Sequence, residues 1–129
     1  MSSITALIVD DSLDIRVIVK EVLNDRGYDV VEAANGYEAI QRARQYRPDL
    51  ILMDLSLPGL DGWEVARRVR SEPALEEIPI IAMTGYCMAS VARLARTAGC
   101  QSVVFKPLRL DDLEREVDEL PKTVGPFLS

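Results

Sequence analysis

The feature that most constrains this chain is an apolar run at residues 50–53, Leu-Ile-Leu-Met, that ends on Asp54. Pro48 precedes the run and Pro58-Gly59 follows it, so turn residues bound it on both sides. Such a run is typical of a strand buried on both faces of a sheet. A strand that ends on a carboxylate delivers it to the sheet edge where ligands bind in open parallel sheets. Asp54 is therefore the first candidate for chemistry.

Similar apolar segments alternate along the chain with segments of helical spacing. The predicted strands are residues 4–9, 28–33, 49–54, 78–83 and 102–105. Strict alternation implies a parallel sheet with helices on both faces and right-handed crossovers, an α/β doubly wound fold. We expect one domain over residues 1–120, followed by a tail at residues 121–129.

Helical periodicity assigns side chains to the inner or outer face of each predicted helix. In the first helix it places Ile15 and Ile18 inward and Arg16 outward. It also places Leu94 of the fourth helix inward and Arg70 of the third helix outward. Ser12 is expected to cap the first helix.

Composition excludes several classes of function. The chain has 129 residues and a net charge of −6, which argues against nucleic-acid binding because that affinity rests on phosphate neutralisation. No apolar run is long enough to cross a membrane, and the N-terminus lacks the basic region of a secretory signal. Cys87 and Cys100 each stand outside any CxxC, which favours reduced thiols in the cytoplasm. The chain has no histidine, so any phosphohistidine must come from a partner.

Polar residues follow four of the five predicted strands. Asp10-Asp11 follow the first strand, Asp54 ends the third, Thr84 follows the fourth and Lys106 follows the fifth. In a parallel sheet these ends lie along one edge, so we expect three carboxylates, one hydroxyl and one ammonium in one shallow pocket.

Such a pocket suits phosphate chemistry with a metal ion. Clustered carboxylates repel one another, so an isolated cluster would either hold protons or recruit a cation. Oxygen ligands without His or Cys suit Mg²⁺ or Mn²⁺ rather than Zn²⁺. Lys106 supplies a point charge for a phosphate, and Thr84 can donate a hydroxyl hydrogen bond to it. Asp54 remains as a carboxylate nucleophile.

The chain resembles the receiver domain of two-component response regulators, and especially the stand-alone receivers of the chemotaxis type. The resemblance spans residues 4–120. It rests on Asp10-Asp11, on Asp54 within Leu-Met-Asp-Leu-Ser-Leu-Pro-Gly-Leu-Asp-Gly, on Thr84, and on Lys106-Pro107. It implies a flavodoxin-like sheet with strand order 2-1-3-4-5.

The resemblance also implies a role for each site residue. Asp54 would accept a phosphoryl group from a phosphohistidine on a sensor histidine kinase or a histidine phosphotransfer protein. Asp11, Asp54 and the backbone carbonyl of Ser56 would bind Mg²⁺, with Asp10 acting mostly through water. Thr84 and Lys106 would bind the phosphate, and the Lys106-Pro107 bond would be cis. Ser56 and Tyr86 would tune the lifetime of the phosphorylated state.

The implied output is a surface formed by the fourth helix, the fifth strand and the fifth helix, which would contact a downstream protein or take part in a phosphorelay. By this resemblance the chain is not an enzyme in the usual sense, but a phosphoacceptor that assists its own phosphorylation and dephosphorylation. Two positions depart from the family pattern. Val103 stands where an aromatic residue is usual, although Phe105 shares its face, and Gly85 stands where alanine is preferred.

Two other readings use the same residues. Val103 is consistent with a receiver-like module that binds proteins without phosphorylation. An aspartyl-nucleophile phosphohydrolase would usually carry a second aspartate two residues after the nucleophile, where this chain has Ser56. The start at Met1 favours a stand-alone receiver over part of a larger protein.

Overall fold

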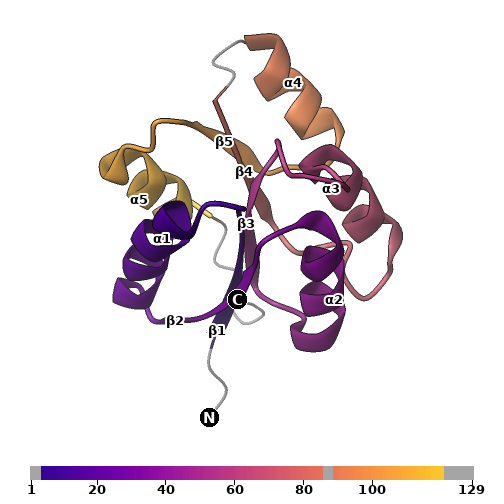
Figure 1. Cartoon of the computed structure of the whole chain (residues 1–129), viewed down its shortest axis with the longest axis horizontal. Coiled ribbons are helices and arrows are strands. Elements are labelled where there is room, and N and C mark those ends of the chain that lie inside the picture. Colours follow the sequence, from indigo (N-terminus) through magenta and orange to yellow (C-terminus); the bar gives the residue numbers. More distant parts are fainter. Residues whose placement is uncertain (1–3, 86–88, 121–129) are drawn as a thin grey trace.

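Strands and helices alternate along the whole part of the chain that the computed structural model describes, residues 4–85 and 89–120 (Figure 1). The strands are β1 (Ile4–Val9), β2 (Tyr28–Ala33), β3 (Leu50–Asp54), β4 (Ile80–Thr84) and β5 (Ser102–Phe105). The helices are α1 (Leu13–Asp25), α2 (Gly36–Tyr46), α3 (Gly62–Ser71), α4 (Ala89–Thr97) and α5 (Leu110–Asp118). The predicted alternation is confirmed. The start of β4 lies two residues later than predicted because Ile78 closes a turn onto the carbonyl of Leu75.

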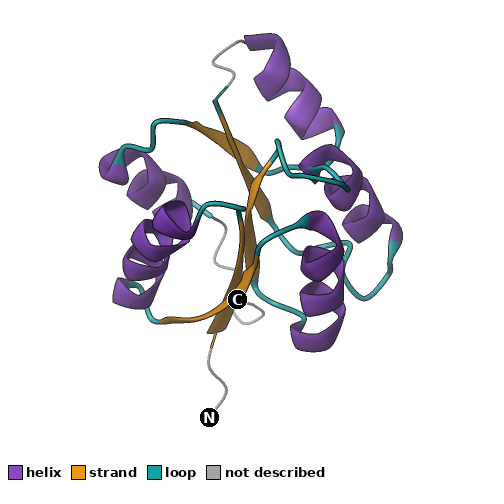
Figure 2. Cartoon of the chain, in the orientation of Figure 1, coloured by secondary structure: helices purple, strands orange, loops and turns teal. Residues whose placement is uncertain are grey.

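The five strands form one parallel sheet in the order β2-β1-β3-β4-β5 (Figure 2). This order confirms the predicted flavodoxin-like fold. The chain leaves β1 for β2 on one side and then crosses to β3 on the other side. The carboxyl ends of β1 and β3 therefore flank the point where the strand order reverses, which is the usual ligand crevice of such sheets.

Apolar side chains fill both faces of the sheet. In Figure 1, α1 and α5 cover one face, and α2, α3 and α4 cover the other. Successive residues of a strand point to opposite faces, so each central strand contributes to two cores. In β3, Leu50 and Leu52 pack beneath α1 and α5, while Ile51 and Met53 pack beneath the other helices. The apolar run at residues 50–53 thus lies at the centre of the molecule.

Polar N-cap residues stand at the starts of α1 and α3, next to the carboxyl edge of the sheet. Ser12 caps α1 as predicted, and its hydroxyl accepts a hydrogen bond from the Ile15 amide. Asp61 caps α3 and accepts from the Glu64 amide at 2.9 Å. These caps satisfy amides that a helix start leaves without a partner. They fix where α1 and α3 begin, close behind the ends of β1 and β3.

The predicted faces of Ile18, Leu94 and Arg70 are wrong. Ile18 is 41% exposed and Leu94 is 58% exposed, whereas their neighbours Val19 and Ala95 take the buried positions of α1 and α4. Arg70 was expected to face solvent, but its guanidinium turns inward. It donates hydrogen bonds to the carbonyls of Gly99, Glu76 and Ile78 at 2.9, 3.0 and 2.7 Å. Arg70 therefore ties the end of α3 to two loops.

The cysteine that the structure describes is a buried free thiol. Cys100 belongs to the core beneath α2, α3 and α4, and burial raises its pKa to about 11. A thiol of this kind is unreactive. Cys87 lies outside the described residues. Within the described part of the chain, no helix has the length and apolar character that a membrane span requires.

Candidate acidic site at the carboxyl edge of the sheet

Polar side chains gather where β1, β3, β4 and β5 end. Asp10 follows β1, Asp54 ends β3, Thr84 ends β4 and Lys106 follows β5. The register of β1 and β3 places the position of Asp10 level with that of Asp54 on adjacent strands. The topology thus brings together residues that are far apart in the sequence, as the strand-end pattern predicted.

Asp54 is held in a fixed orientation at the floor of this site. The residue is only 5% exposed. Its Oδ1 accepts a hydrogen bond from the Ser56 amide at 2.8 Å, and its Oδ2 accepts one from Lys106 Nζ at 3.0 Å. The Leu55 amide donates to the Met83 carbonyl at 3.0 Å, which secures the end of β3 against β4. The carboxylate is therefore oriented before any ligand arrives.

Asp10 is completely buried, and its polar groups are all engaged. Its Oδ1 accepts from the Ser12 amide at 2.9 Å and its Oδ2 accepts from Lys106 Nζ at 2.8 Å. Burial raises the pKa of Asp10 more than the hydrogen bonds from Lys106 and Ser12 lower it. The ionised form of Asp10 is thus disfavoured in the folded chain, because burial removes the carboxylate from water.

Lys106 joins the two buried carboxylates. Burial alone would lower its pKa, but hydrogen bonds from its ammonium to Asp10 and Asp54 outweigh burial, so the pKa is raised. The Lys106 amide donates to the Thr84 carbonyl at 2.7 Å, and the Lys106-Pro107 peptide bond is cis. Lys106 therefore remains a positive charge beside Asp54.

Asp11 completes a group of three carboxylates. Asp10, Asp11 and Asp54 each offer one oxygen, and these oxygens all lie within 4.8 Å of one another. Asp11 is exposed, whereas the other two are buried. One lysine against three carboxylates leaves an excess of negative charge. An all-oxygen donor set with that excess fits Mg²⁺, which is usually bound by one or two carboxylates and keeps several waters.

Thr84 and its neighbours lie on the β4–β5 side of the site. Thr84 is 1% exposed and is the register partner of Phe105. Val103, where the family usually has an aromatic residue, packs against the core beneath α2, α3 and α4. Phe105 shares its face by strand alternation. An aromatic residue, Phe105, therefore ends β5 beside Thr84, two positions later than in the family pattern.

The remaining candidates are only partly described. Ser56 is exposed at the rim and contributes its amide to Asp54. Tyr86 lies outside the described residues. Gly85 is exposed, and an added Cβ there would meet no atom within 4 Å.

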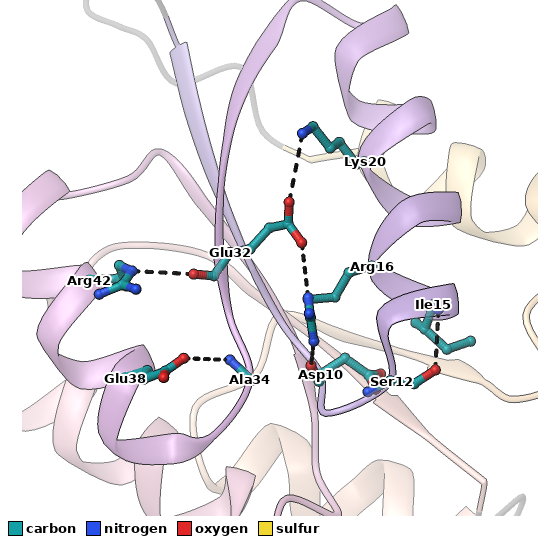
Figure 3. A network of polar contacts seen from close by, with 9 residues as sticks. All are labelled: Asp10, Ser12, Ile15, Arg16, Lys20, Glu32, Ala34, Glu38 and Arg42. Atoms are coloured by element: carbon teal, nitrogen blue, oxygen red, sulfur yellow. Dashed lines mark hydrogen bonds and ion pairs between the residues drawn. The ribbon is translucent and has the colours of Figure 1, made fainter.

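Arg16 was not among the predicted site residues, and its expected outward orientation is wrong. Figure 3 shows its guanidinium between Glu32 and the main chain of Asp10. It donates from Nε to Glu32 Oε1 at 2.9 Å and from a terminal nitrogen to the Asp10 carbonyl at 2.7 Å. The available signals were a basic residue one turn after the Ser12 cap and a glutamate in an otherwise apolar part of β2.

Comparison with known proteins gives one consistent family. The model of the response regulator receiver domain matches residues 6–118. The polar-differentiation response regulator DivK of Brucella anthropi is 35% identical over 104 residues, covering 81% of this chain and 85% of DivK. The sporulation initiation phosphotransferase F of Bacillus subtilis is 36% identical over 111 residues, covering 86% of this chain and 88% of that protein.

Solved structures agree with the fold. Chemotaxis response regulator CheY4 of Vibrio cholerae has a TM-score of 0.85 and 30% identity, covering 91% of this chain and 98% of CheY4. The receiver domain of sensor histidine kinase PA1611 of Pseudomonas aeruginosa has a TM-score of 0.80 and 30% identity, covering 91% of this chain and 96% of that domain. Its structure has a magnesium ion coordinated in the active-site cleft. A third similar structure comes from a co-crystal of the Saccharomyces cerevisiae phosphotransfer protein Ypd1 with the receiver domain of Ssk1. The match has a TM-score of 0.79 and 28% identity, and it covers 89% of this chain and 86% of the matched chain.

Proposed function

Because this chain belongs to the family of response regulator receiver domains, we propose that it is a single-domain response regulator whose Asp54 accepts a phosphoryl group from a phosphohistidine. The observation that carries the proposal is the position of Lys106. Its ammonium lies 3.0 Å from Asp54 Oδ2 and 2.8 Å from Asp10 Oδ2, within a group of three carboxylates. A carboxylate nucleophile, a fixed cation and a metal-binding donor set are the parts that phosphoryl transfer needs.

In the proposed reaction a carboxylate oxygen of Asp54 forms a bond to phosphorus as the bond between phosphorus and the donor imidazole nitrogen breaks. The imidazole leaves with the electron pair of the broken bond. Lys106 holds an oxygen of the transferring group and offsets its charge. The Thr84 hydroxyl donates to another oxygen. The Ser56 amide keeps Asp54 directed toward the incoming phosphorus.

We assign the Mg²⁺ ligands to Asp11, Asp54 and the backbone carbonyl of Ser56, with Asp10 acting through water; Mn²⁺ would serve as a substitute. When bound, the metal neutralises charge on the phosphoryl oxygens. The burial of Asp10 and its hydrogen bond to Lys106 support an indirect role for that residue. The lifetime of the aspartyl phosphate would depend on Ser56 and Tyr86, which would control the attack of water. The chain would thus assist its own phosphorylation and dephosphorylation and have no other enzymatic activity.

The partner would be a sensor histidine kinase or a histidine phosphotransfer protein, because the chain itself has no histidine. Leu13 and Val17 of α1 support a docking face beside the site, since they are 62% and 49% exposed and lie one turn apart just after Asp11. The crystal of the similar Ssk1 receiver with Ypd1 is consistent with such a partner. We place the protein in the cytoplasm, where its lone cysteines stay reduced.

The proposed output uses α4, β5 and α5 to contact a downstream protein. Phosphorylation adds negative charge and acceptor oxygens at one strand end, which would draw Thr84 and Lys106 inward. The hydrogen bond from the Lys106 amide to the Thr84 carbonyl supports a joint movement of the two residues. The receiver domain would span residues 1–120, and residues 121–129 would form a C-terminal tail.

The proposal is tested by intact mass after incubation with Mg²⁺ and acetyl phosphate. We expect one phosphoryl adduct on the wild type, none on Asp54→Asn, and an unchanged adduct on Asp29→Asn, which alters an exposed aspartate of β2. Omission of Mg²⁺ should abolish the adduct. A folded wild type that gives no adduct with this donor or with a phosphorylated kinase would support a phosphorylation-independent binding module. Release of phosphate over many turnovers would support a phosphohydrolase.

A further inference from the structure

Arg16 is a largely buried arginine on α1, directly behind the acidic site. Its side chain is only 16% exposed. The guanidinium makes two hydrogen bonds of 2.9 Å or less, one to the side chain of Glu32 and one to the main-chain carbonyl of Asp10 (Figure 3). A charged side chain stays buried only when it is paired and hydrogen-bonded, so these two contacts hold the guanidinium in one position.

The carbonyl that Arg16 binds belongs to the peptide bond between Asp10 and Asp11. The Asp10 amide donates to the Ala33 carbonyl at 3.1 Å, and the Asp10 carbonyl accepts from Arg16 at 2.7 Å. The backbone of Asp10 is therefore fixed from β2 on one side and from α1 on the other. Since a peptide unit is planar, fixing this carbonyl also fixes the direction in which the chain enters Asp11.

Glu32 holds the guanidinium in place. One of its carboxylate oxygens accepts from Arg16, and the other lies 3.7 Å from Lys20 Nζ. The main-chain carbonyl of Glu32 accepts from Arg42 Nε of α2 at 3.2 Å. The contact therefore belongs to a network that joins α1, β2 and α2 behind the site (Figure 3).

We propose that Arg16, oriented by Glu32, is a positioning residue for the divalent-cation site: it holds the Asp10-Asp11 peptide so that both carboxylates meet the carboxylate of Asp54. The inference rests on the proposed function, because it takes the cation to bind Asp11 and Asp54 directly and Asp10 through water. Arg16 touches neither the cation nor the phosphoryl group. It acts through the main chain of Asp10.

A simple charge effect makes the opposite prediction for one variant. If Arg16 acted only as a positive charge near the site, its removal would strengthen Mg²⁺ binding. Removal of the Glu32 carboxylate would weaken binding, and removal of both groups would leave the affinity unchanged. A positioning role predicts weaker binding in all three cases, because each change releases the Asp10 carbonyl.

The test is titration of the unphosphorylated protein with MgCl₂ at constant ionic strength, followed by amide chemical shifts. We expect the Mg²⁺ dissociation constant to rise about tenfold in Arg16→Met and about as much in Glu32→Met, the usual scale for groups that orient metal ligands. The double variant should be no weaker than Arg16→Met. Arg26→Met is the matched control, because Arg26 lies at the far end of α1 and pairs with Asp118. Its dissociation constant should stay within twofold of the wild-type value.

Arg16→Lys keeps the charge and most of the side-chain volume but loses the forked geometry, so it should fold and still bind Mg²⁺ more weakly. Equal or tighter binding by Arg16→Met, or wild-type affinity in the double variant and in Arg16→Lys, would overturn the positioning role. Failure of the wild type to bind Mg²⁺ would instead contradict the proposed function. The two failures are therefore distinguishable.

Discussion

At the scale of single residues, the acidic site works against the stability of the fold. Asp10 is fully buried, and its raised pKa shows that burial outweighs the hydrogen bonds from Lys106 and Ser12. The unfolded chain ionises this carboxyl near its ordinary pKa of 3.8, whereas the folded chain ionises it at higher pH. The native state therefore loses stability as pH rises from the unfolded value through the folded one.

Replacement of this carboxyl should remove that pH dependence. With the metal chelated, we expect Asp10→Asn to have a larger free energy of unfolding than the wild type at pH 7, by on the order of 1 kcal/mol. The difference should grow between pH 4 and 7, since only the wild type carries the ionising group. Urea denaturation measures it, with Asp29→Asn as the control. A difference that is constant over this range would show that burial of Asp10 is not the cause.

Residue positions at the site were predictable to different degrees. Asp10, Asp54, Thr84 and Lys106 follow directly from strand ends, because a parallel sheet brings those ends to one edge whatever the packing details. Arg16 does not follow in this way. It lies on the flank of α1, and whether a flanking arginine faces water or a glutamate on β2 depends on how the helix sits on the sheet. Helical periodicity contains no such information.

At the scale of elements, the turn between β3 and α3 is fixed by close backbone approach. An added Cβ at Gly62 would collide with the Asp54 carbonyl and lie 2.7 Å from Leu55 Cα. On the other side, one at Gly36 would lie 2.9 Å from the Cβ of Leu60. The segment that follows Asp54 is therefore confined between the starts of α2 and α3, which helps to fix the direction of that carboxylate.

Alanine at this turn should therefore be poorly tolerated. We expect Gly62→Ala to lower the free energy of unfolding by about 2–3 kcal/mol, because backbone atoms must move to admit the methyl group. Gly85→Ala is the matched control and should change stability by less than about 0.5 kcal/mol, since that position is open. Urea denaturation of both variants provides the measurement. Equal effects would contradict the close-contact explanation.

Apolar periodicity predicted the order of the elements and most of their bounds. It predicted less accurately which side chains face the core and which face solvent. Arg70 illustrates the reason. Its charge predicts exposure, yet three carbonyls of irregular loops attract its five-donor guanidinium inward. Those loops have no sequence periodicity, so the position of their carbonyls could not be predicted.

At the scale of the whole molecule, the site draws on four strands and is supported by both cores. Asp54 ends a strand whose side chains alternate between the two apolar layers. A cation that binds only the folded chain should therefore stabilise the entire domain by mass action.

We expect Mg²⁺ at ten times its dissociation constant to raise the free energy of unfolding by about 1.4 kcal/mol. A chelator should reverse the gain, and Asp54→Asn should reduce it. Thermal or urea denaturation with and without MgCl₂ at matched ionic strength measures the effect. Identical transitions for the wild type would exclude binding at the three carboxylates.

The burial of Asp10 also has a consequence for directed evolution. A library selected only for resistance to heat would favour neutral residues at this position, because loss of the Asp10 carboxylate removes the cost of burying its charge. The more thermostable variants would therefore be the ones that lose metal binding and signalling. A thermostability campaign on this protein would need a parallel screen for metal binding, and the sequences that survive both would identify which carboxylates the chemistry requires.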